Sequence, residues 1–384
     1  MSFGVLVASL AAAIWVYLLI GRGRFWRGWA EPATSRLDVY PPVVVVIPAR
    51  NEVLVIGDSL RSLFQQDYPG AVRVVVVDDH SGDGTAEAAR QAAAAWGASD
   101  RLTVVAAPAL PSGWVGKVAA MQAGYRHVQT AVTDARFVLF TDADIRHGKE
   151  SLRRLVERAE AMRLDLVSLM VRLKRRSFAE RALVPAFVFF FRMLYPFSQV
   201  NDQRSPVAAA AGGCMLLRRA ALERIGGLRE IKDALIDDCA LARAVKRHGA
   251  IRLDIAEASE SLRGYDGLPD MWRLIARTAF AELRYSPVRL AVALAGLSLV
   301  FVAPPLLAIL GAGRAAALGL AAWIAMSIAF MPCLRYYQSS LAWAPCLPLI
   351  TLFYTGATLD SARRHWAGRG GEWKERFQSE IAGS

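Results

Sequence analysis

Apolar residues gather at the two ends of this 384-residue chain, and the middle region mixes short apolar runs with polar stretches. A helix that crosses the hydrocarbon core of a bilayer, about 30 Å thick, needs roughly 20 mostly apolar residues. This length predicts four membrane-spanning helices, the last of them interrupted by two prolines: Phe3–Ile20, Leu290–Ala312, Ala315–Leu334 and Leu341–Leu359. The expected organisation is an anchor at 1–22, a membrane region at 288–360 and a basic tail at 361–384.

The charges beside the first apolar segment predict its orientation. Arg22, Arg24 and Arg27 follow the segment, and no small-residue cleavage site is evident, so the segment is expected to remain as an anchor. Basic residues favour the cytoplasmic side, which places the N-terminus outside and the middle region inside. Three further crossings would leave the tail outside, although its basic residues favour the inside. A re-entrant last segment, or an apparent span that does not cross, would reconcile the two.

The middle region, 42–285, is predicted to form an α/β fold with a mostly parallel central sheet. Short β-branched runs alternate with helical stretches, as in a parallel sheet covered by helices. The expected strands are Val43–Ile47, Val72–Val77, Leu102–Ala106 and Phe137–Thr141, and the expected helices are Val53–Gln66, Thr85–Trp96 and Lys117–Val128.

Polar residues follow three of these strands directly. In parallel sheets the ligand lies beyond the carboxyl ends of the strands. A single aspartate there is ordinary turn chemistry, but carboxylates gathered at one edge repel each other unless a cation or a donor-rich ligand is present. The strand ends concerned are Pro48-Ala49-Arg50-Asn51-Glu52, Asp78-Asp79-His80-Ser81 and Asp142-Ala143-Asp144. The sequence therefore predicts a ligand site at this edge.

Charge and cysteine content narrow the classes of function. The formal net charge is +12, but the basic residues lie largely beside apolar segments, where anionic lipid headgroups attract them, so we expect no nucleic-acid partner. The four cysteines have no metal-binding spacing. Gly82-Asp83-Gly84 lacks the third glycine of a dinucleotide-binding loop, and Gly116-Lys117-Val118 lacks the remainder of a phosphate-binding loop.

Taken together, the motifs of the middle region resemble the family 2 glycosyltransferases of GT-A fold. The shared elements occur in that family's order: Val43 to Glu52, Asp78-Asp79-His80-Ser81, Gly116-Lys117, Thr141-Asp142-Ala143-Asp144 and Ile236-Asp237-Asp238. Further phrases, including Gly113 to Lys117 and Ala211 to Leu216, are similar to hopene-associated glycosyltransferases, relatives of the ceramide glucosyltransferases. The resemblance implies a nucleotide sugar as donor, with uridine as the family's usual nucleoside. It also implies a hopanoid-like lipid as acceptor at the bacterial cytoplasmic membrane.

The chemistry of sugar transfer assigns expected roles to these residues. A departing diphosphate is stabilised by Mg²⁺ or Mn²⁺ held by carboxylates, for which Asp142 and Asp144 are the candidates, two positions apart on an emerging strand. Asp144 is the better candidate for direct ligation. Lys117, at a helix start, is expected at the diphosphate, with a surface lysine as the alternative. Asp79 is expected at the nucleobase or ribose, and the resemblance adds Pro48, Ala49 and Glu52 to that wall.

Inverting transfer needs one general base near the acceptor hydroxyl. Asp238 is the expected base because it takes the last position of the family's acidic pair, with Asp237 where many relatives carry glutamate. Without that context, an aspartate at a helix start would more simply be a partner of the helix dipole.

The acceptor side is less constrained by the sequence. The Gln-x-x-Arg-Trp element of processive synthases is absent from 272–278, which favours transfer of a single sugar. The run Leu183–Phe197 is either a segment in the membrane interface or a buried core helix. A polyprenyl-phosphate or ceramide-like acceptor, a catalytically silent membrane scaffold and a transporter remain as alternatives, the last disfavoured because no ionisable pair lies in the predicted spans.

Overall fold

The computed structural model describes residues 2–370 and divides into two compact units. One unit holds the sheet and comprises 30–174 and 199–264. The other is helical and comprises, of the described residues, 2–29, 175–198 and 265–370. Segments 175–198 and 265–285, which lie inside the predicted 42–285 domain, thus pack with the membrane-type helices. The basic tail predicted at 361–384 lies outside the described residues from 371 onward.

The sheet unit contains one eight-stranded sheet of order β3-β2-β1-β4-β7-β6-β8-β5. Strands β3, β2, β1 and β4 are parallel neighbours, and β7 enters antiparallel between β4 and β6. This confirms the predicted mostly parallel α/β sheet. The strands are β1 (Val43–Ala49), β2 (Val72–Asp78), β3 (Leu102–Ala106), β4 (Phe137–Phe140), β5 (Ile145–Arg146), β6 (Leu166–Arg172), β7 (Met215–Arg218) and β8 (Ile251–Ser261).

Helices cover both faces of this sheet. The core on one face joins alternate strand residues such as Val45 and Val74 to Leu60 of α2 and Leu155 of α5. On the other face α4 packs so closely that a Cβ at Gly124 would lie 2.4 Å from Val46 Cγ1. Continuous burial on both faces explains why β1 reads as an uninterrupted apolar run. The helices of this unit are α2 (Ile56–Phe64), α3 (Thr85–Ala95), α4 (Gly116–Ala131), α5 (Ser151–Ala161), α8 (Arg219–Arg224) and α9 (Asp237–Lys246).

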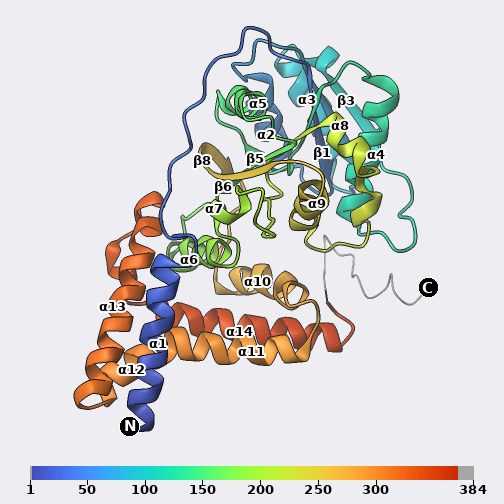
Figure 1. Cartoon of the computed structure of the whole chain (residues 1–384). Coiled ribbons are helices and arrows are strands. Elements are labelled where there is room, and N and C mark those ends of the chain that lie inside the picture. Colours follow the sequence, from blue (N-terminus) through green and yellow to red (C-terminus); the bar gives the residue numbers. More distant parts are fainter. Residues whose placement is uncertain (1, 371–384) are drawn as a thin grey trace. The chain divides into compact units, whose positions relative to one another are not determined.

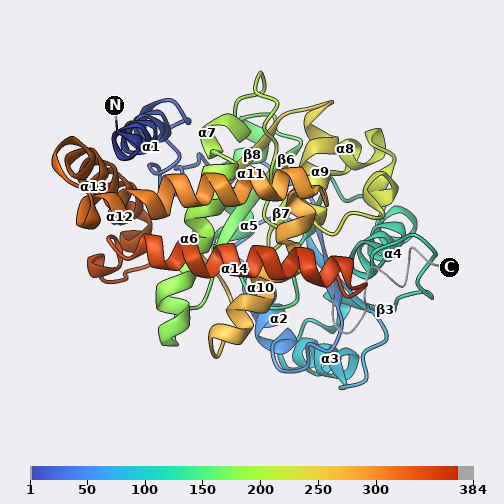
Figure 2. The same ribbon diagram turned by 90° about the horizontal axis from the view of Figure 1, so that it is seen from below.

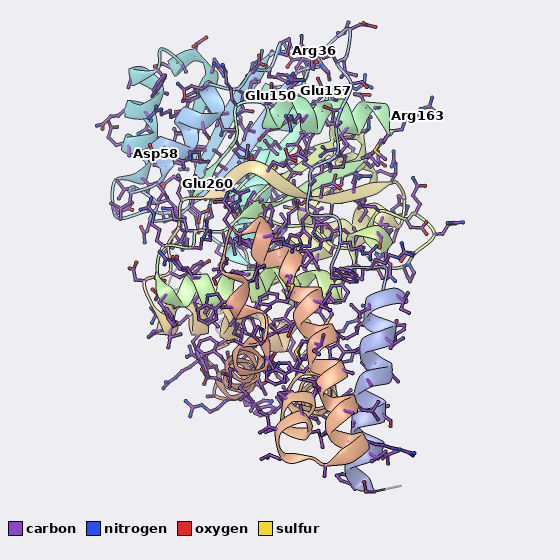
Figure 3. The ribbon with its side chains drawn as sticks, turned by 90° about the vertical axis from the view of Figure 1, so that its left-hand side faces the viewer. Arg36, Asp58, Glu150, Glu157, Arg163 and Glu260 are labelled. Carbon is purple, nitrogen blue, oxygen red and sulfur yellow. The ribbon has the colours of Figure 1, made fainter. Side chains whose placement is uncertain are left out.

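A buried carboxylate fastens the segment that precedes β1 to the sheet unit. Glu157 of α5, labelled in Figure 3, is fully buried and accepts hydrogen bonds from Thr34, from Tyr40 Oη at 2.6 Å and from Arg153 at 3.0 Å. A buried charge needs such partners to offset its lost hydration. The segment 30–42 is therefore held to α5 rather than left as a loose linker.

The helical unit contains two helices that run in the same direction. A Cβ at Gly4, at the start of α1 (Phe3–Ile20), would lie 3.7 Å from Ala315 at the start of α13 (Gly313–Tyr336). At the other end, the ring of Trp29 lies 5.4 Å from that of Tyr336. In Figure 1 the two helices lie side by side, and in Figure 2 they are seen nearly end-on while α14 (Leu347–Trp366) is seen along its length. Helix α14 therefore runs across α1 and α13.

Among the described residues, three helical segments are long and apolar enough to cross a membrane: Phe3–Ile20, Pro287–Leu310 and Gly313–Tyr336. They match the first three predicted spans. The fourth, Leu341–Leu359, is not among them, because the structure begins the helix only at Leu347 and continues it through Asp360, Arg363 and Arg364. The second segment comprises α11 (Pro287–Leu297), a π-helical turn (Ser298–Val302) and α12 (Ala303–Leu310).

The run predicted as either an interfacial segment or a buried helix lies on α6 (Phe178–Leu194), inside the helical unit. Its arginine, Arg192, is 3% exposed and donates to the backbone carbonyls of Arg27 and Gly28. The guanidinium also stacks 4.2 Å from the ring of Trp29 and 4.6 Å from that of Phe197. Such contacts stabilise a buried cation and tie α6 to the segment that follows α1. The remaining helices are α7 (Phe197–Val200) and α10 (Leu268–Glu282).

Candidate active site

The carboxyl ends of β1 and β2 form one wall of the candidate site. Asp79 follows β2, and its N–H donates to the carbonyl of Ala49 at 2.8 Å, so the strand ends are joined beyond the regular ladder. The Asp79 side chain is 3% exposed, and Arg50 Nη1 lies 3.9 Å from its Oδ2 and donates to its backbone carbonyl at 2.6 Å. Pro48 and Ala49 are the last residues of β1. These predicted residues are therefore neighbours.

The neighbouring Asp78, the last residue of β2, has one unusual atom. Its Oδ1 is buried and has no hydrogen-bond partner in the part of the chain that the structure describes. Buried carboxylate oxygens are nearly always paired, so this atom can accept a hydrogen bond from a ligand.

The two aspartates of the Asp142-Ala143-Asp144 motif differ from expectation in their backbone. Strand β4 ends at Phe140, and Ile145 N donates to Asp142 O at 3.3 Å, so the motif forms a turn rather than a strand extension. The alternation of side chains along a strand therefore does not determine where the side chains of Asp142 and Asp144 lie. Asp142 pairs with Lys117, whereas Asp144 is 8% exposed and its Oδ2 accepts from Arg263 Nε at 3.0 Å.

Lys117 lies at the centre of the carboxylate cluster. It is the second residue of α4, and its Nζ lies 2.8 Å from Asp142 Oδ1 and 3.4 Å from Asp237 Oδ2. Burial by itself would lower the pKa of this ammonium, but the attraction of Asp142 and Asp237 outweighs it and raises the pKa. Lys117 is therefore a permanent cation that joins the β4 turn to the start of α9, which excludes the alternative of a free surface lysine.

Asp238, the expected base, is held by two backbone donors. Gly212 N–H donates to Oδ2 at 2.9 Å and Cys239 N–H donates to Oδ1 at 2.7 Å. Burial and the neighbouring charge of Asp237 raise the pKa of Asp238 to about 6, against the opposing effect of Lys117. A carboxylate with this pKa is mostly ionised at neutral pH, and it is more basic than an ordinary aspartate.

Gly212 is a glycine for steric reasons. A Cβ at this position would lie 3.1 Å from Lys117 Nζ and 3.4 Å from Asp238 Oδ2. The absence of a side chain thus lets the backbone approach both charged groups.

The structure adds two residues to the site, His147 and Arg263, that belong to none of the motifs recognised in the sequence. His147 Nε2 lies 2.9 Å from Thr141 Oγ1, which donates to the carbonyl of Gly213 at 2.7 Å, so the β4 turn is fixed to the glycine pair. Burial lowers the pKa of His147 to about 4, and the ring is neutral at pH 7. Arg263, beyond β8, donates from Nη2 to Glu52 Oε1 at 2.8 Å as well as to Asp144. Only the folded chain brings these distant positions together.

The carboxylates fit a divalent metal that arrives with phosphate ligands. No group of three or more histidine, cysteine, aspartate or glutamate side chains suited to a metal occurs among residues 2–370. Mg²⁺ and Mn²⁺ in nucleotide sites commonly take one or two carboxylates and complete their shell with phosphate oxygens and water. Asp142 and Asp144 offer two such carboxylates, and in the structure their charges are balanced by Lys117 and Arg263.

Two family models match the chain. One, described as glycosyl transferase family 2, matches residues 44–226, and the other, glycosyl transferase family group 2, matches residues 137–357. The second match covers more than half of the chain. No curated protein matches the sequence.

Several solved structures are similar to the chain. The mannosyltransferase PcManGT from Pyrobaculum calidifontis, in complex with GDP-Man and Mn²⁺, is 20% identical with a TM-score of 0.54, over 95% of this chain and 99% of that one. TarS of S. aureus is 22% identical with a TM-score of 0.41, over 62% of this chain and 40% of that one. The mannosyl-3-phosphoglycerate synthase of Rubrobacter xylanophilus is 20% identical with a TM-score of 0.35, over 64% and 77%.

The similarity to the mannosyltransferase extends beyond the sheet unit, since it covers nearly the whole chain. It supports the GT-A-like fold that the sequence motifs predict. On the strength of the family model that spans residues 137–357, this chain belongs to glycosyl transferase family group 2.

Proposed function

We propose that the chain is a membrane-anchored inverting glycosyltransferase that transfers one sugar from a nucleotide sugar to a lipid hydroxyl. The observation that carries this proposal is the position of Lys117 between Asp142 and Asp237, next to Asp238. Lys117 joins the Asp142-Ala143-Asp144 motif, expected at the donor diphosphate, to the acidic pair Asp237-Asp238, expected at the acceptor.

In the proposed reaction Asp238 accepts the proton of the acceptor hydroxyl. The acceptor oxygen then forms a bond to the anomeric carbon while the bond from that carbon to the diphosphate oxygen breaks, so one displacement inverts the configuration. The two backbone donors on Asp238 fix its orientation, and its pKa of about 6 keeps it ionised at neutral pH yet able to take a proton.

The chain's other charged groups act on the donor. Lys117 is a permanent cation at the expected diphosphate end and holds Asp237 and Asp142 in place. Asp79, Asp78 and Glu52, with Pro48 and Ala49, are proposed to line the nucleoside end. A divalent metal held by Asp144 and Asp142, when bound, would supply positive charge that stabilises the departing diphosphate.

The helical unit supports a topology of three crossings. Helices α1 and α13 run in the same direction, so the chain must return across the membrane between them. The return is consistent with two contacts: Val300 O accepts from Trp15 Nε1 at 2.8 Å, and Leu307 lies beside Gly4, so this stretch runs opposite to α1. Because α14 runs across the spans, the segment after α14 is proposed to stay on the side of the membrane where α1 and α13 end. The basic residues after α1 favour the cytoplasm for that side, and the proposed topology would then put the basic residues that follow α14 there as well.

A lipid acceptor is proposed because the catalytic motifs are joined to a membrane anchor in one chain, and a hopanoid or similar polycyclic isoprenoid because of the resemblance to hopene-associated enzymes. A polyprenyl-phosphate or ceramide-like lipid would use the same catalytic residues.

The test is sugar transfer by the purified full-length protein. Radiolabelled UDP- and GDP-sugars are offered with extracted bacterial lipids, in Mg²⁺ or Mn²⁺ and in EDTA, to the wild type and to Asp238→Asn. We expect a labelled lipid whose formation needs metal and falls at least about 100-fold in the variant, the usual loss on removing a general base. Mass spectrometry of that lipid identifies the acceptor.

The matched control is Asp202→Asn, which should leave transfer unchanged. Asp202 is a partly exposed aspartate of the sheet unit that pairs with Arg204. Failure to label any lipid with any donor, by protein that melts cooperatively and binds no nucleotide sugar, would favour the silent scaffold instead. A labelled lipid formed equally well by Asp238→Asn would contradict the assignment of the base.

A further inference from the structure

Arg263 links two acidic residues from opposite sides of the candidate donor site. Its Nη2 donates to Glu52 Oε1 at 2.8 Å, beyond the end of β1, and its Nε donates to Asp144 Oδ2 at 3.0 Å, in the turn after β4. The backbone around Asp144 is held to the same segment, because Leu262 N–H donates to Asp144 O at 2.6 Å.

Asp144 and Arg263 differ in their exposure to solvent, and this difference affects how a cation could bind Asp144. Asp144 is nearly buried, so its charge must be matched, whereas the Arg263 side chain is 41% exposed. The guanidinium can therefore turn toward solvent without opening the core, while Asp144 cannot. Gly264 follows Arg263 and ends the sheet unit, and the last segment of the helical unit begins at Tyr265.

A divalent cation and this guanidinium compete for one carboxylate. A metal ligated by Asp144 would lie within a few ångströms of the Arg263 cation, and like charges at that separation repel strongly in a partly buried site. The same Asp144 Oδ2 that accepts from Arg263 is one of the two atoms available to a metal.

We propose that Arg263 is an internal counter-ion of the donor site, which neutralises Asp144 in the metal-free state and must leave Asp144 before a divalent cation binds there. This inference rests on the proposed function, since it takes Asp144 to be a metal ligand. Arg263 acts through Asp144 and is a positioning residue. Its presence lowers the affinity for metal alone and so favours metal that arrives together with a nucleoside diphosphate.

The test measures Mn²⁺ binding to the full-length protein in detergent, without nucleotide, from the electron paramagnetic resonance signal of free Mn²⁺. In Arg263→Gln we expect Mn²⁺ to bind roughly fivefold to tenfold more tightly than in the wild type, as for the loss of one partly exposed charge-assisted contact. Arg263→Lys keeps the charge but cannot span Glu52 and Asp144, so its affinity should be intermediate. Asp144→Asn should lose the site.

Arg146→Gln is the matched control, because it removes the same charge from β5, next to the motif. Arg146 pairs with Glu260, which Figure 3 labels on β8, and not with Asp144. Its Mn²⁺ affinity should stay within about twofold of the wild type, since exposed pairs contribute little. A gain in Arg146→Gln equal to that in Arg263→Gln would reduce the effect to net charge and overturn the inference.

Two other outcomes separate this inference from the proposed function. Equal or weaker Mn²⁺ binding in Arg263→Gln, with binding lost in Asp144→Asn, would overturn the counter-ion role and leave the donor site standing. Mn²⁺ binding that Asp144→Asn does not reduce, with or without UDP or GDP, would overturn both.

Discussion

The backbone N–H of Gly212 donates a hydrogen bond to Oδ2 of Asp238 at 2.9 Å, so a residue of the loop before β7 orients the proposed base at the start of α9. The two positions are 26 residues apart in the chain. The contact requires a residue without a side chain, because Lys117 occupies the space next to it.

Gly212→Ala is expected to lower kcat about tenfold or more while the protein still folds. The new Cβ would lie 3.1 Å from Lys117 Nζ, and the end of this flexible side chain can move by a few tenths of an ångström. That movement disturbs the Lys117 contacts to Asp142 and Asp237, and small misplacements at a reacting site are costly. Sugar-transfer assays measure kcat of the variant, and a thermal melt checks that the variant is folded.

Gly57→Ala in α2 is the control for that substitution, since nothing lies within 4 Å of its Cβ position. It should be neutral or slightly stabilising, as alanine is the better helix former. Unchanged kcat in Gly212→Ala would show that Lys117 and Asp238 tolerate displacement and are not set as proposed.

The pH dependence of transfer should report Asp238. The base acts when deprotonated, and its pKa is about 6, so kcat/KM should be level above about pH 7 and fall toward tenfold per pH unit below 6. An ordinary aspartate would place this fall near pH 4. A profile of initial rates from pH 4.5 to 8, with substrate well below KM, decides between the two. A rate that stays level down to pH 5 would contradict the raised pKa.

His147 should make the sheet unit sensitive to acid. Its folded pKa, about 4, lies below the value of about 6.5 for an unfolded histidine, so the unfolded state binds the proton more tightly. The free energy of unfolding should therefore fall as pH drops from about 6.5 to 4, by up to about 3 kcal/mol from this group alone. Above pH 7 the group has no such effect.

The contribution of His147 is isolated by comparing wild type with His147→Gln. Glutamine retains a donor for Thr141 but does not titrate, so the difference in Tm between the two proteins should shrink or reverse between pH 7.5 and pH 5. Asp238 titrates in both and its effect cancels. A difference in Tm that is constant with pH would contradict a neutral, buried His147.

The three-crossing topology predicts that the sheet unit and the segment after α14 share one side of the membrane. Single cysteines placed at exposed positions, Ser99 in the sheet unit and Arg369 after α14, in a background lacking the four native cysteines, should both react with an impermeant thiol reagent in inverted vesicles. Neither should react in intact cells. Opposite accessibility of the two positions would require a fourth crossing.

Much of the sheet unit follows from local pattern. Strands β1, β2 and β3 begin where the β-branched runs predict. For β1 and most of β2 the reason is that strands buried on both faces need continuous apolar sequence. Convergence of the strand ends also follows, since parallel strands place their carboxyl ends at one edge. The first three predicted spans match apolar helices for a similar reason, since length and apolarity are local properties of the sequence.

What only the tertiary structure decided involves residues far apart in sequence. Three contacts have no local signal, because each depends on how loops meet after the sheet forms: the pairing of Arg263 with Glu52 and Asp144, the hydrogen bond from Thr141 to Gly213, and the contact of Gly212 with Asp238. The direction of α14 was decided in the same way: an apolar run of near-spanning length also suits a helix that packs across others, and its neighbours, with Asp360 bonded to Trp272 of α10, set its course. The chain's sequence thus determined its elements and its chemistry, and packing determined which charges meet.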